Sequence, residues 1–202
     1  NVDNFIEYRK EKWDSFIQKY DVISQSCDLF DNTELACRVR HHGQDNKLLL
    51  CRSNEMEELL IGQSKLVEEN FQSNPYQGLI YIMFKEQSGE VIPLYIGKTE
   101  KYGKTANKIS INISKLKNNK GKFARWGDGY QYHIGDLSAI ALPGHDPQKR
   151  TKKYDNWAKA IFEDYPSQTL ILKFPVKFWC IAWHKDYSGA WEEFGPTNLT
   201  FL

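Results

Sequence analysis

Two tyrosines occupy positions from which their side chains could do chemistry together. Tyr81 and Tyr95 lie in two runs of β-branched and aromatic residues, 78–85 and 91–99, and residues 87–90 supply a Gly-containing turn between them. This pattern predicts a β-hairpin. If the register of the hairpin allows, both phenols lie on one face and could hold a water molecule or a phosphate oxygen. The alternative is packing, because Tyr is a common cross-strand partner in aromatic sheets.

Positive charge is concentrated after the hairpin. The chain carries 27 Lys and Arg against 26 Asp and Glu, but residues 98–125 hold nine basic residues and one acid, whereas residues 1–72 hold 14 acids and 9 basic residues. Another basic run covers residues 149–153. Such runs favour a phosphate-backbone partner only modestly, since most are solvated surface. The candidate nucleic-acid contacts are Lys104, Lys108, Lys115, Lys117, Lys122, Lys149 and Arg150.

Other metal-binding patterns in the sequence are weak. The four cysteines form no CxxC pair, so the sequence predicts neither a zinc ribbon nor a redox couple, and thiols in an ordinary core are the preferred interpretation. Asp128 and Asp136 could form a metal pair, but Asp128 stands between two glycines, which is typical of a turn. No zinc module has the spacing of the last candidate group, Cys37, His41, His42 and Cys51.

The part of the chain before the hairpin is predicted to be mainly helical. Apolar residues recur at three- and four-residue spacing over residues 4–23 and 55–71, which indicates two amphipathic helices. A short apolar run at residues 48–51 could be a strand. The sequence Asn-Pro at residues 74–75 ends this part. We therefore expect one module at residues 1–75, which could recognise DNA or a partner, and a second at residues 76–202.

After the hairpin, the pattern predicts further helices and one more strand. Residues 105–116 and 155–163 are expected to be helical, and residues 170–183 a strand or a bent strand pair. Residues 195–197 resemble a helix start, because Thr can cap a helix. The aromatic segment 179–191 could stack on bases, but packing is the preferred interpretation. The expected fold class is α+β, with a small, mostly antiparallel sheet flanked by helices.

This order of elements resembles the GIY-YIG nuclease family, and in particular its restriction-type branch. Tyr95, Ile96 and Gly97 match the second motif of the family literally. The first motif is matched by residues 79–81, where leucine replaces the motif glycine and Gly78 lies one position earlier. The resemblance covers residues 76–202 and does not extend to residues 1–75.

The resemblance implies roles for individual residues. Tyr81 and Tyr95 would be the paired tyrosines, one of which activates or orients the attacking water. Lys98 would lower the pKa of a phenol or hold phosphate. Arg125 would clamp the scissile phosphate and offset charge in the transition state. The second polar group that such nucleases place after the arginine would be His133 or, failing it, Tyr130 or Tyr132.

The family also carries one metal-binding Glu on the helix after its third strand. That Glu would hold a single Mg²⁺ or Mn²⁺, which stabilises the leaving oxygen. Here it should follow the helix start near Thr197, but no acid follows Glu193. We expect it to lie beyond Leu202, or to be lost. Glu192 and Glu193 lie before the helix start, so they would be poor substitutes for the metal-binding Glu.

The implied function is metal-dependent hydrolysis of phosphodiester bonds in DNA, as a restriction or phage-defence endonuclease. One alternative is a catalytically inactive module that binds nucleic acid without cutting it. Another is an assembly subunit of a defence complex, in which the acidic N-terminal module does the work. No run approaches the ~20 apolar residues that cross a bilayer, so we expect a cytoplasmic protein without a membrane partner. The expected partner is double-stranded DNA. The sequence is also compatible with a homo-oligomer.

Overall fold

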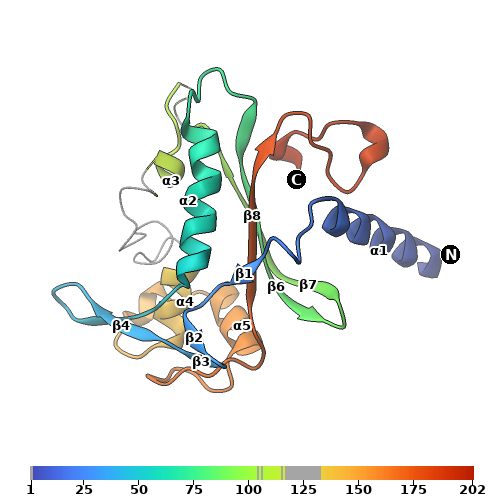
Figure 1. The fold of residues 1–202 in the computed structure, drawn as a ribbon. Coiled ribbons are helices and arrows are strands. Elements are labelled where there is room, and N and C mark those ends of the chain that lie inside the picture. Colours follow the sequence, from blue (N-terminus) through green and yellow to red (C-terminus); the bar gives the residue numbers. More distant parts are fainter. Residues whose placement is uncertain (1, 104, 106, 115, 117–132) are drawn as a thin grey trace. The chain divides into compact units, whose positions relative to one another are not determined.

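The computed structural model describes residues 2–103, 105, 107–114, 116 and 133–202. It has an α+β fold in which a four-stranded antiparallel sheet is accompanied by helices (Figure 1). The chain divides into two units, each assembled from separate segments. The sheet unit comprises Asn1–Cys27, Gly62–Ile113 and Lys177–Leu202. The second unit comprises Asp28–Ile61 and Ser114–Val176, and we call it the α4–α5 unit after its helices α4 (His133–Ala141) and α5 (Lys152–Ile161). Each unit contains residues from both sides of residue 75. The boundary between two modules that the sequence predicts near residue 75 stays a prediction.

The predicted hairpin is confirmed and forms the middle and one edge of the sheet. Its strands are β6 (Tyr76–Gln87) and β7 (Glu90–Glu100), joined by a two-residue loop in which both residues have positive φ. Positive φ at both positions is the requirement of a type I′ turn, which suits the twist of a hairpin. Strand β8 (Lys177–His184) pairs with the other side of β6, and β1 (Cys27–Asp28) lies beyond it, in the order β1-β8-β6-β7.

One face of the sheet packs against the N-terminal helix α1 (Val2–Lys19). Phe16 of α1 lies against Trp179 and Trp183 of β8, with ring centroids 6.1 and 6.4 Å apart. Both tryptophans are fully buried, so packing is the role that the structure gives them. Helix α1 and the second half of α2 (Asn54–Glu68) lie on opposite sides of the sheet (Figure 1).

Both helices of the N-terminal part are confirmed, and each ends earlier than the spacing of apolar residues predicted. In α1 the cause is a Schellman motif: Asp21 has φ 49°, and the backbone N–H groups of Asp21 and Val22 bond to the carbonyls of Gln18 and Ile17. In α2 the side chain of Asn74 folds back and donates to the last helical carbonyls. Capping geometry of this kind leaves little trace in the periodicity of a sequence.

The described part of the α4–α5 unit contains two complete helices, the first half of α2 and two short hairpins. Helix α5 (Lys152–Ile161) confirms the predicted helix at 155–163 and starts earlier because Thr151 caps it, whereas α4 (His133–Ala141) was not predicted. The strand expected at 48–51 is β5 (Lys47–Leu50), which pairs with β4 (Val39–His42). Strands β2 (Asn32–Thr33) and β3 (Ala36–Cys37) form the second hairpin.

Three predicted elements differ from the structure. Within 105–116, the described helix is confined to α3 (Ile111–Ser114), consistent with the stiff β-branched residues around it. The strand predicted at 170–183 begins only at Lys177, and two isolated bridges precede it. Thr197 caps no helix: its hydroxyl accepts from Gly189 N, and Asn198 caps the 3₁₀ turn η4 (Leu199–Phe201) instead. Two further 3₁₀ turns are η2 (Pro147–Lys149) and η3 (Glu192–Phe194).

No helix in the described part of the chain is both long and apolar enough to span a membrane.

Candidate active site

The register of the hairpin brings the two candidate tyrosines together. Tyr81 pairs with Gly97 and Met83 pairs with Tyr95, so the side chains of Tyr81 and Tyr95 lie on the same face of the sheet. Their ring centroids are 6.1 Å apart and their planes are inclined by only 16°. The side chain of Tyr95 is half-buried, whereas Tyr81 is 3% exposed. Of the two phenols, Tyr95 is therefore the one that a solvent molecule or a phosphate can reach more easily.

Gly97 is the position that makes room for this arrangement. A Cβ atom on Gly97 would lie 2.3 Å from both Cζ and the hydroxyl oxygen of Tyr81, far inside van der Waals contact. The ring of Tyr81 thus lies directly over the backbone of Gly97, and on its other side it approaches Phe178 with a centroid distance of 6.3 Å. The glycine of the second motif has a steric role here that no other residue could fill.

Gly78, the glycine displaced by one position from the first motif, has a different role. It has φ 147°, and a Cβ atom there would lie 2.1 Å from the Thr99 carbonyl oxygen and 2.6 Å from a methyl carbon of Leu199. The position therefore lets the buried side chain of Leu199 approach the backbone of β6. Leu79, which takes the motif position, is itself fully buried.

The structure does not bring Lys98 together with the tyrosines. Alternation along β7 puts Tyr95 and Gly97 on one face and Lys98 on the other, opposite Ile80. The ammonium group of Lys98 donates to the carbonyl oxygens of Leu199, at 3.0 Å, and of Thr200. In this arrangement Lys98 holds the end of the chain rather than a phenol.

We call residues 197–202 the C-terminal turn, and two hydrogen bonds besides those of Lys98, together with the burial of Leu199, fix it to the sheet. The side-chain oxygen of Gln77 accepts from Leu199 N at 2.8 Å, and the indole N–H of Trp183 donates to the Thr197 carbonyl at 2.8 Å. Leu199 is buried at 1% exposure. The turn is therefore an integral part of the sheet unit.

The other predicted site residues are only partly described. Arg125, Lys104, Lys115, Lys117 and Lys122 lie outside the described residues, as do Tyr130, Tyr132 and Asp128. His133 is the first residue of α4, and Asp136 lies in the same helix, in the α4–α5 unit and not in the sheet unit. Lys149 ends the 3₁₀ turn η2, Arg150 follows it, and Lys108 is exposed beside the start of α3.

The described residues contain no group of three His, Cys, Asp or Glu side chains that could hold a metal ion. Glu192 and Glu193 instead tie η3 to α1, since their carboxylates pair with Lys19 at 2.9 Å and with Lys12 at 2.7 Å. The hydrogen bond from Lys12 lowers the pKa of Glu193 to about 2. These acids therefore stabilise a helix contact and offer no ligand set.

The cysteines are buried or half-buried free thiols. Burial raises the pKa of Cys37 to about 12, and it raises the pKa of Cys180 as well. Both thiols are therefore protonated near neutral pH, whereas the thiolate is the form that binds metals and attacks electrophiles.

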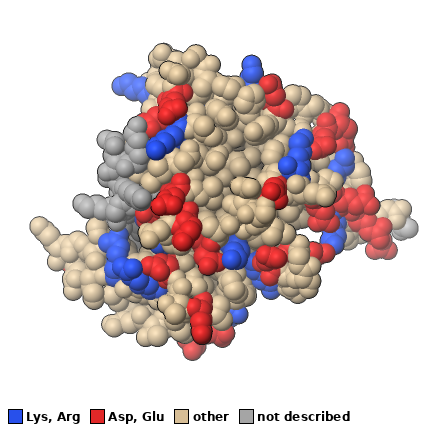
Figure 2. Space-filling model, in the orientation of Figure 1, with Lys and Arg blue, Asp and Glu red and all other residues tan. Residues whose placement is uncertain are grey.

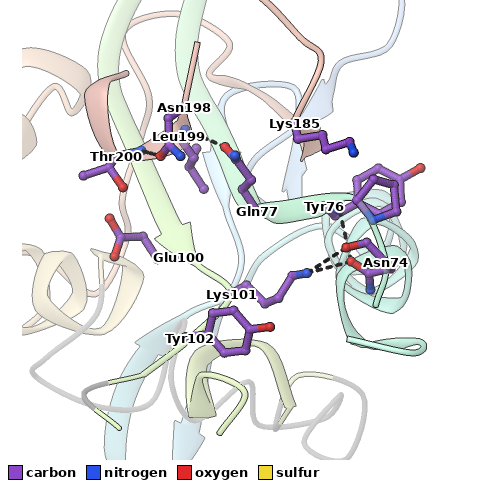
Figure 3. Close-up of a pocket in the computed structure, with 11 residues that line it drawn as sticks. Asn74, Tyr76, Gln77, Glu100, Lys101, Tyr102, Lys185, Asn198, Leu199 and Thr200 are labelled. Atoms are coloured by element: carbon purple, nitrogen blue, oxygen red, sulfur yellow. Dashed lines mark hydrogen bonds between the residues drawn. The ribbon is translucent and has the colours of Figure 1, made fainter. Parts of the chain in front are cut away.

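A pocket of 380 Å³ opens at the end of the sheet, beside the C-terminal turn (Figure 3). Its floor contains Lys101, a lysine only 6% exposed whose ammonium donates to the Phe71 and Asn74 carbonyls and to Oδ1 of Asn74. Burial lowers the pKa of Lys101. The lining comprises Asn74, Pro75, Tyr76, Gln77, Glu100, Lys101, Tyr102, Lys185, Asn198, Leu199 and Thr200.

Sequence reasoning missed this pocket because its residues come from four separate segments. The one local signal was the Asn-Pro break at residues 74–75, which marks a turn but not its partner. No periodic pattern connects Asn74 with Lys101 or Lys185, and only the fold brings them to one place.

The face of the molecule drawn in Figure 2 carries charges of both signs. On the face that Figure 2 shows, Lys and Arg side chains are interspersed with Asp and Glu and form no single basic patch. Much of the predicted basic segment lies at residues that are not described. No protein-family model matches the chain, and neither a curated protein nor a solved structure proves significantly similar to it.

Proposed function

We propose that this chain is a metal-dependent endonuclease that hydrolyses phosphodiester bonds in double-stranded DNA, in restriction or phage defence in the cytoplasm. The observation that supports the proposal best is the pair of nearly parallel phenols, Tyr81 and Tyr95, on one face of a hairpin whose glycine, Gly97, is sterically required. Phenols held this way can accept and donate hydrogen bonds to a water molecule beside a phosphate.

The two phenols would have unequal roles. Tyr95 is half-buried and would contact the attacking water or the scissile phosphate. Tyr81 is almost completely buried and would act as a positioning residue that supports Tyr95. Arg125 is proposed to clamp the phosphate, because its fork of donors matches two phosphate oxygens, and His133 is proposed as the second polar group.

A divalent cation, Mg²⁺ or Mn²⁺, would stabilise the charge on the leaving oxygen. The described residues offer no carboxylate set beside the tyrosines to hold such an ion. The cation is therefore proposed without a described ligand set. The groups that the protein itself would supply for the reaction are the two phenols and Arg125.

The second candidate is a module that binds nucleic acid without cutting it. The burial of Tyr81 favours this candidate, because a phenol at 3% exposure that lies between Gly97 and Phe178 is also what plain sheet packing would produce. The two candidates agree on the partner and differ on whether the chemical step occurs.

The test is nicking of supercoiled plasmid by the full chain with Mg²⁺ or Mn²⁺. Tyr95→Phe removes one hydroxyl and keeps the ring, so we expect a loss of about 10²- to 10⁴-fold in nicking rate with DNA binding kept. Arg125→Ala should lose nicking as well. Tyr187→Phe is the matched control, because Tyr187 lies in the sheet unit and its side chain makes ring contacts with its described neighbours that a phenylalanine would keep.

The result that would decide against the enzyme is equally clear. If the wild-type chain binds plasmid but never nicks it with either metal ion, the non-cutting module replaces the nuclease. Nicking that persists unchanged in Tyr95→Phe would remove the phenol pair as its chemical basis.

A further inference from the structure

The pocket at the end of the sheet is lined by charged side chains of both signs and by aromatic rings. Its volume of 380 Å³ lies within the range of about 300–1,000 Å³ that is usual for small-ligand sites. All of its lining residues belong to the sheet unit. Glu100 and Lys185 both line it, and Figure 3 shows them on opposite sides of the pocket, with Lys101 between them.

Many polar groups of the pocket wall are engaged by the protein. All three ammonium hydrogens of Lys101 have carbonyl or amide acceptors. The side-chain oxygens of Gln77 and Asn198 accept from Leu199 N and Thr200 N. These groups build the wall, and they keep their positions without a ligand.

Other polar groups of the wall remain open. Among the described residues, the ammonium of Lys185 and the carboxylate of Glu100 have no hydrogen-bonding or ionic partner, and the NH₂ groups of Gln77 and Asn198 are likewise unused. With Lys101, the pocket contains two cations and one anion. A ligand that fits must therefore bring a negative group for Lys185 and hydrogen-bond donors for Glu100.

Two aromatic rings in the wall are held in fixed orientations. The ring of Tyr76 stands edge-on to His184, with centroids 5.5 Å apart and planes at 88°. The ring of Tyr102 stands against Phe71 at 6.3 Å, and its hydroxyl donates to the Phe71 carbonyl. Rings fixed by such contacts offer a planar ligand a stacking surface at low entropic cost.

We propose that this pocket binds a single nucleotide. Lys185 would bind its phosphate, Tyr76 or Tyr102 would stack on its base, and Glu100 would accept from the exocyclic amino group of the base. Cytosine, adenine and guanine carry such an amino group, whereas thymine does not, so the pocket should prefer the first three to thymine. That the nucleotide comes from a DNA strand rests on the proposed function, and a free nucleoside monophosphate would offer the same chemistry.

Lys98 has an indirect role in this site. Leu199 and Thr200 form one wall of the pocket, and Lys98 and Gln77 hold that wall in place. Lys98 is thus a positioning residue, and its removal should weaken nucleotide binding without any change to a group that contacts the ligand.

The experiment measures binding of dCMP, dAMP, dTMP and inorganic phosphate to the full chain by titration calorimetry. Lys185→Gln should weaken all four ligands, by about tenfold or more, because it removes a charge-assisted hydrogen bond. Glu100→Gln should abolish the preference for dCMP and dAMP over dTMP and leave phosphate binding unchanged. Lys65→Gln and Glu86→Gln are matched controls, because both residues are exposed in the sheet unit and neither lines the pocket.

A second arm distinguishes the two sources of a nucleotide and separates this inference from the nuclease. Fluorescence anisotropy with a short single-stranded oligonucleotide, compared with dCMP, shows whether the pocket takes a strand or a free nucleotide. Absence of binding by the wild type at millimolar dCMP and micromolar oligonucleotide overturns the inference, as does binding that neither variant changes. If the wild type nicks plasmid but Lys185→Gln has no effect on nucleotide binding, the nucleotide site is refuted and the nuclease proposal is kept. If Lys185→Gln weakens nucleotide binding but the wild type never nicks plasmid, the nucleotide site is kept and the nuclease proposal is refuted.

Discussion

The two faces of the hairpin β6–β7 carry side chains with different roles. On one face, Tyr81 and Tyr95 form a ring pair above Gly97. On the other, Lys98 binds the C-terminal turn by two carbonyl contacts. Because side chains alternate along a strand, Tyr95 and Gly97 belong to the candidate chemical surface, whereas Lys98, the next residue, holds the C-terminal turn on the other face. Adjacency in sequence says little about adjacency in a site when the residues are in a strand.

The largest expected effect comes from Gly97→Ala, which tests the tyrosine face. Its Cβ would lie 2.3 Å from two atoms of Tyr81, so the ring must move and the sheet must adjust. Overpacking of this kind costs about 1–3 kcal/mol or more in the free energy of unfolding, which urea denaturation measures. A Cβ atom on the helical Gly62 would meet no described atom beyond its own helix within 4 Å, and Gly62→Ala should be neutral or stabilising. Equal stability of the Gly97→Ala variant and the wild type would contradict the close approach of Tyr81.

A smaller effect is expected from Lys98→Met, which tests the opposite face. The change removes two hydrogen bonds to Leu199 and Thr200 and should cost about 1 kcal/mol of unfolding free energy. Hydrogen exchange should accelerate at the backbone N–H groups of the C-terminal turn, while the Tyr81–Tyr95 pair keeps its geometry. Lys98→Arg, which can still donate to both carbonyls, should restore slow exchange. Exchange that is accelerated equally in Lys98→Arg and Lys98→Met would speak against the attachment.

The smallest effect concerns the helix that covers the face of Lys98. Glu193 has a pKa lowered to about 2 by its hydrogen bond from Lys12, below its ordinary value of 4.5. Its contribution to stability is therefore present above about pH 4.5 and is lost as the pH falls toward 2. Glu193→Gln should be slightly less stable than the wild type at pH 7, and the two curves of stability against pH should converge near pH 2. Because Glu193 is exposed, the difference is small, and a constant gap across this range would exclude the ion pair as its cause.

The sequence was sufficient for the hairpin and the two N-terminal helices, but not for the residues that these elements contact. The hairpin follows from two β-branched runs and a Gly-containing turn, and both N-terminal helices follow from apolar spacing. The register could not be predicted, because Leu94 is a one-residue bulge between the pairs Met83–Tyr95 and Phe84–Pro93, and one residue decides which side chains share a face.

Contacts between distant residues were the other limit of the sequence. Lys98 was expected to act on a phenol, but its partners lie 101 and 102 positions further along the chain. The pocket depends on the same kind of contact, since Lys101 holds a turn that lies 27–30 positions earlier. Such pairings are decided by tertiary packing, and no spacing rule within one element encodes them.

Strand β7 is an edge strand of the sheet, and this position bears on solubility. An open edge offers a row of N–H and C=O groups with which a second chain can pair, and two exposed isoleucines, Ile92 and Ile96, would add apolar contact there. Pro93, which has no N–H to donate, stands between them, and the bulge at Leu94 interrupts the regular spacing of the strand. The sequence thus places two obstacles to intermolecular strand pairing at the part of the sheet where aggregation would otherwise begin.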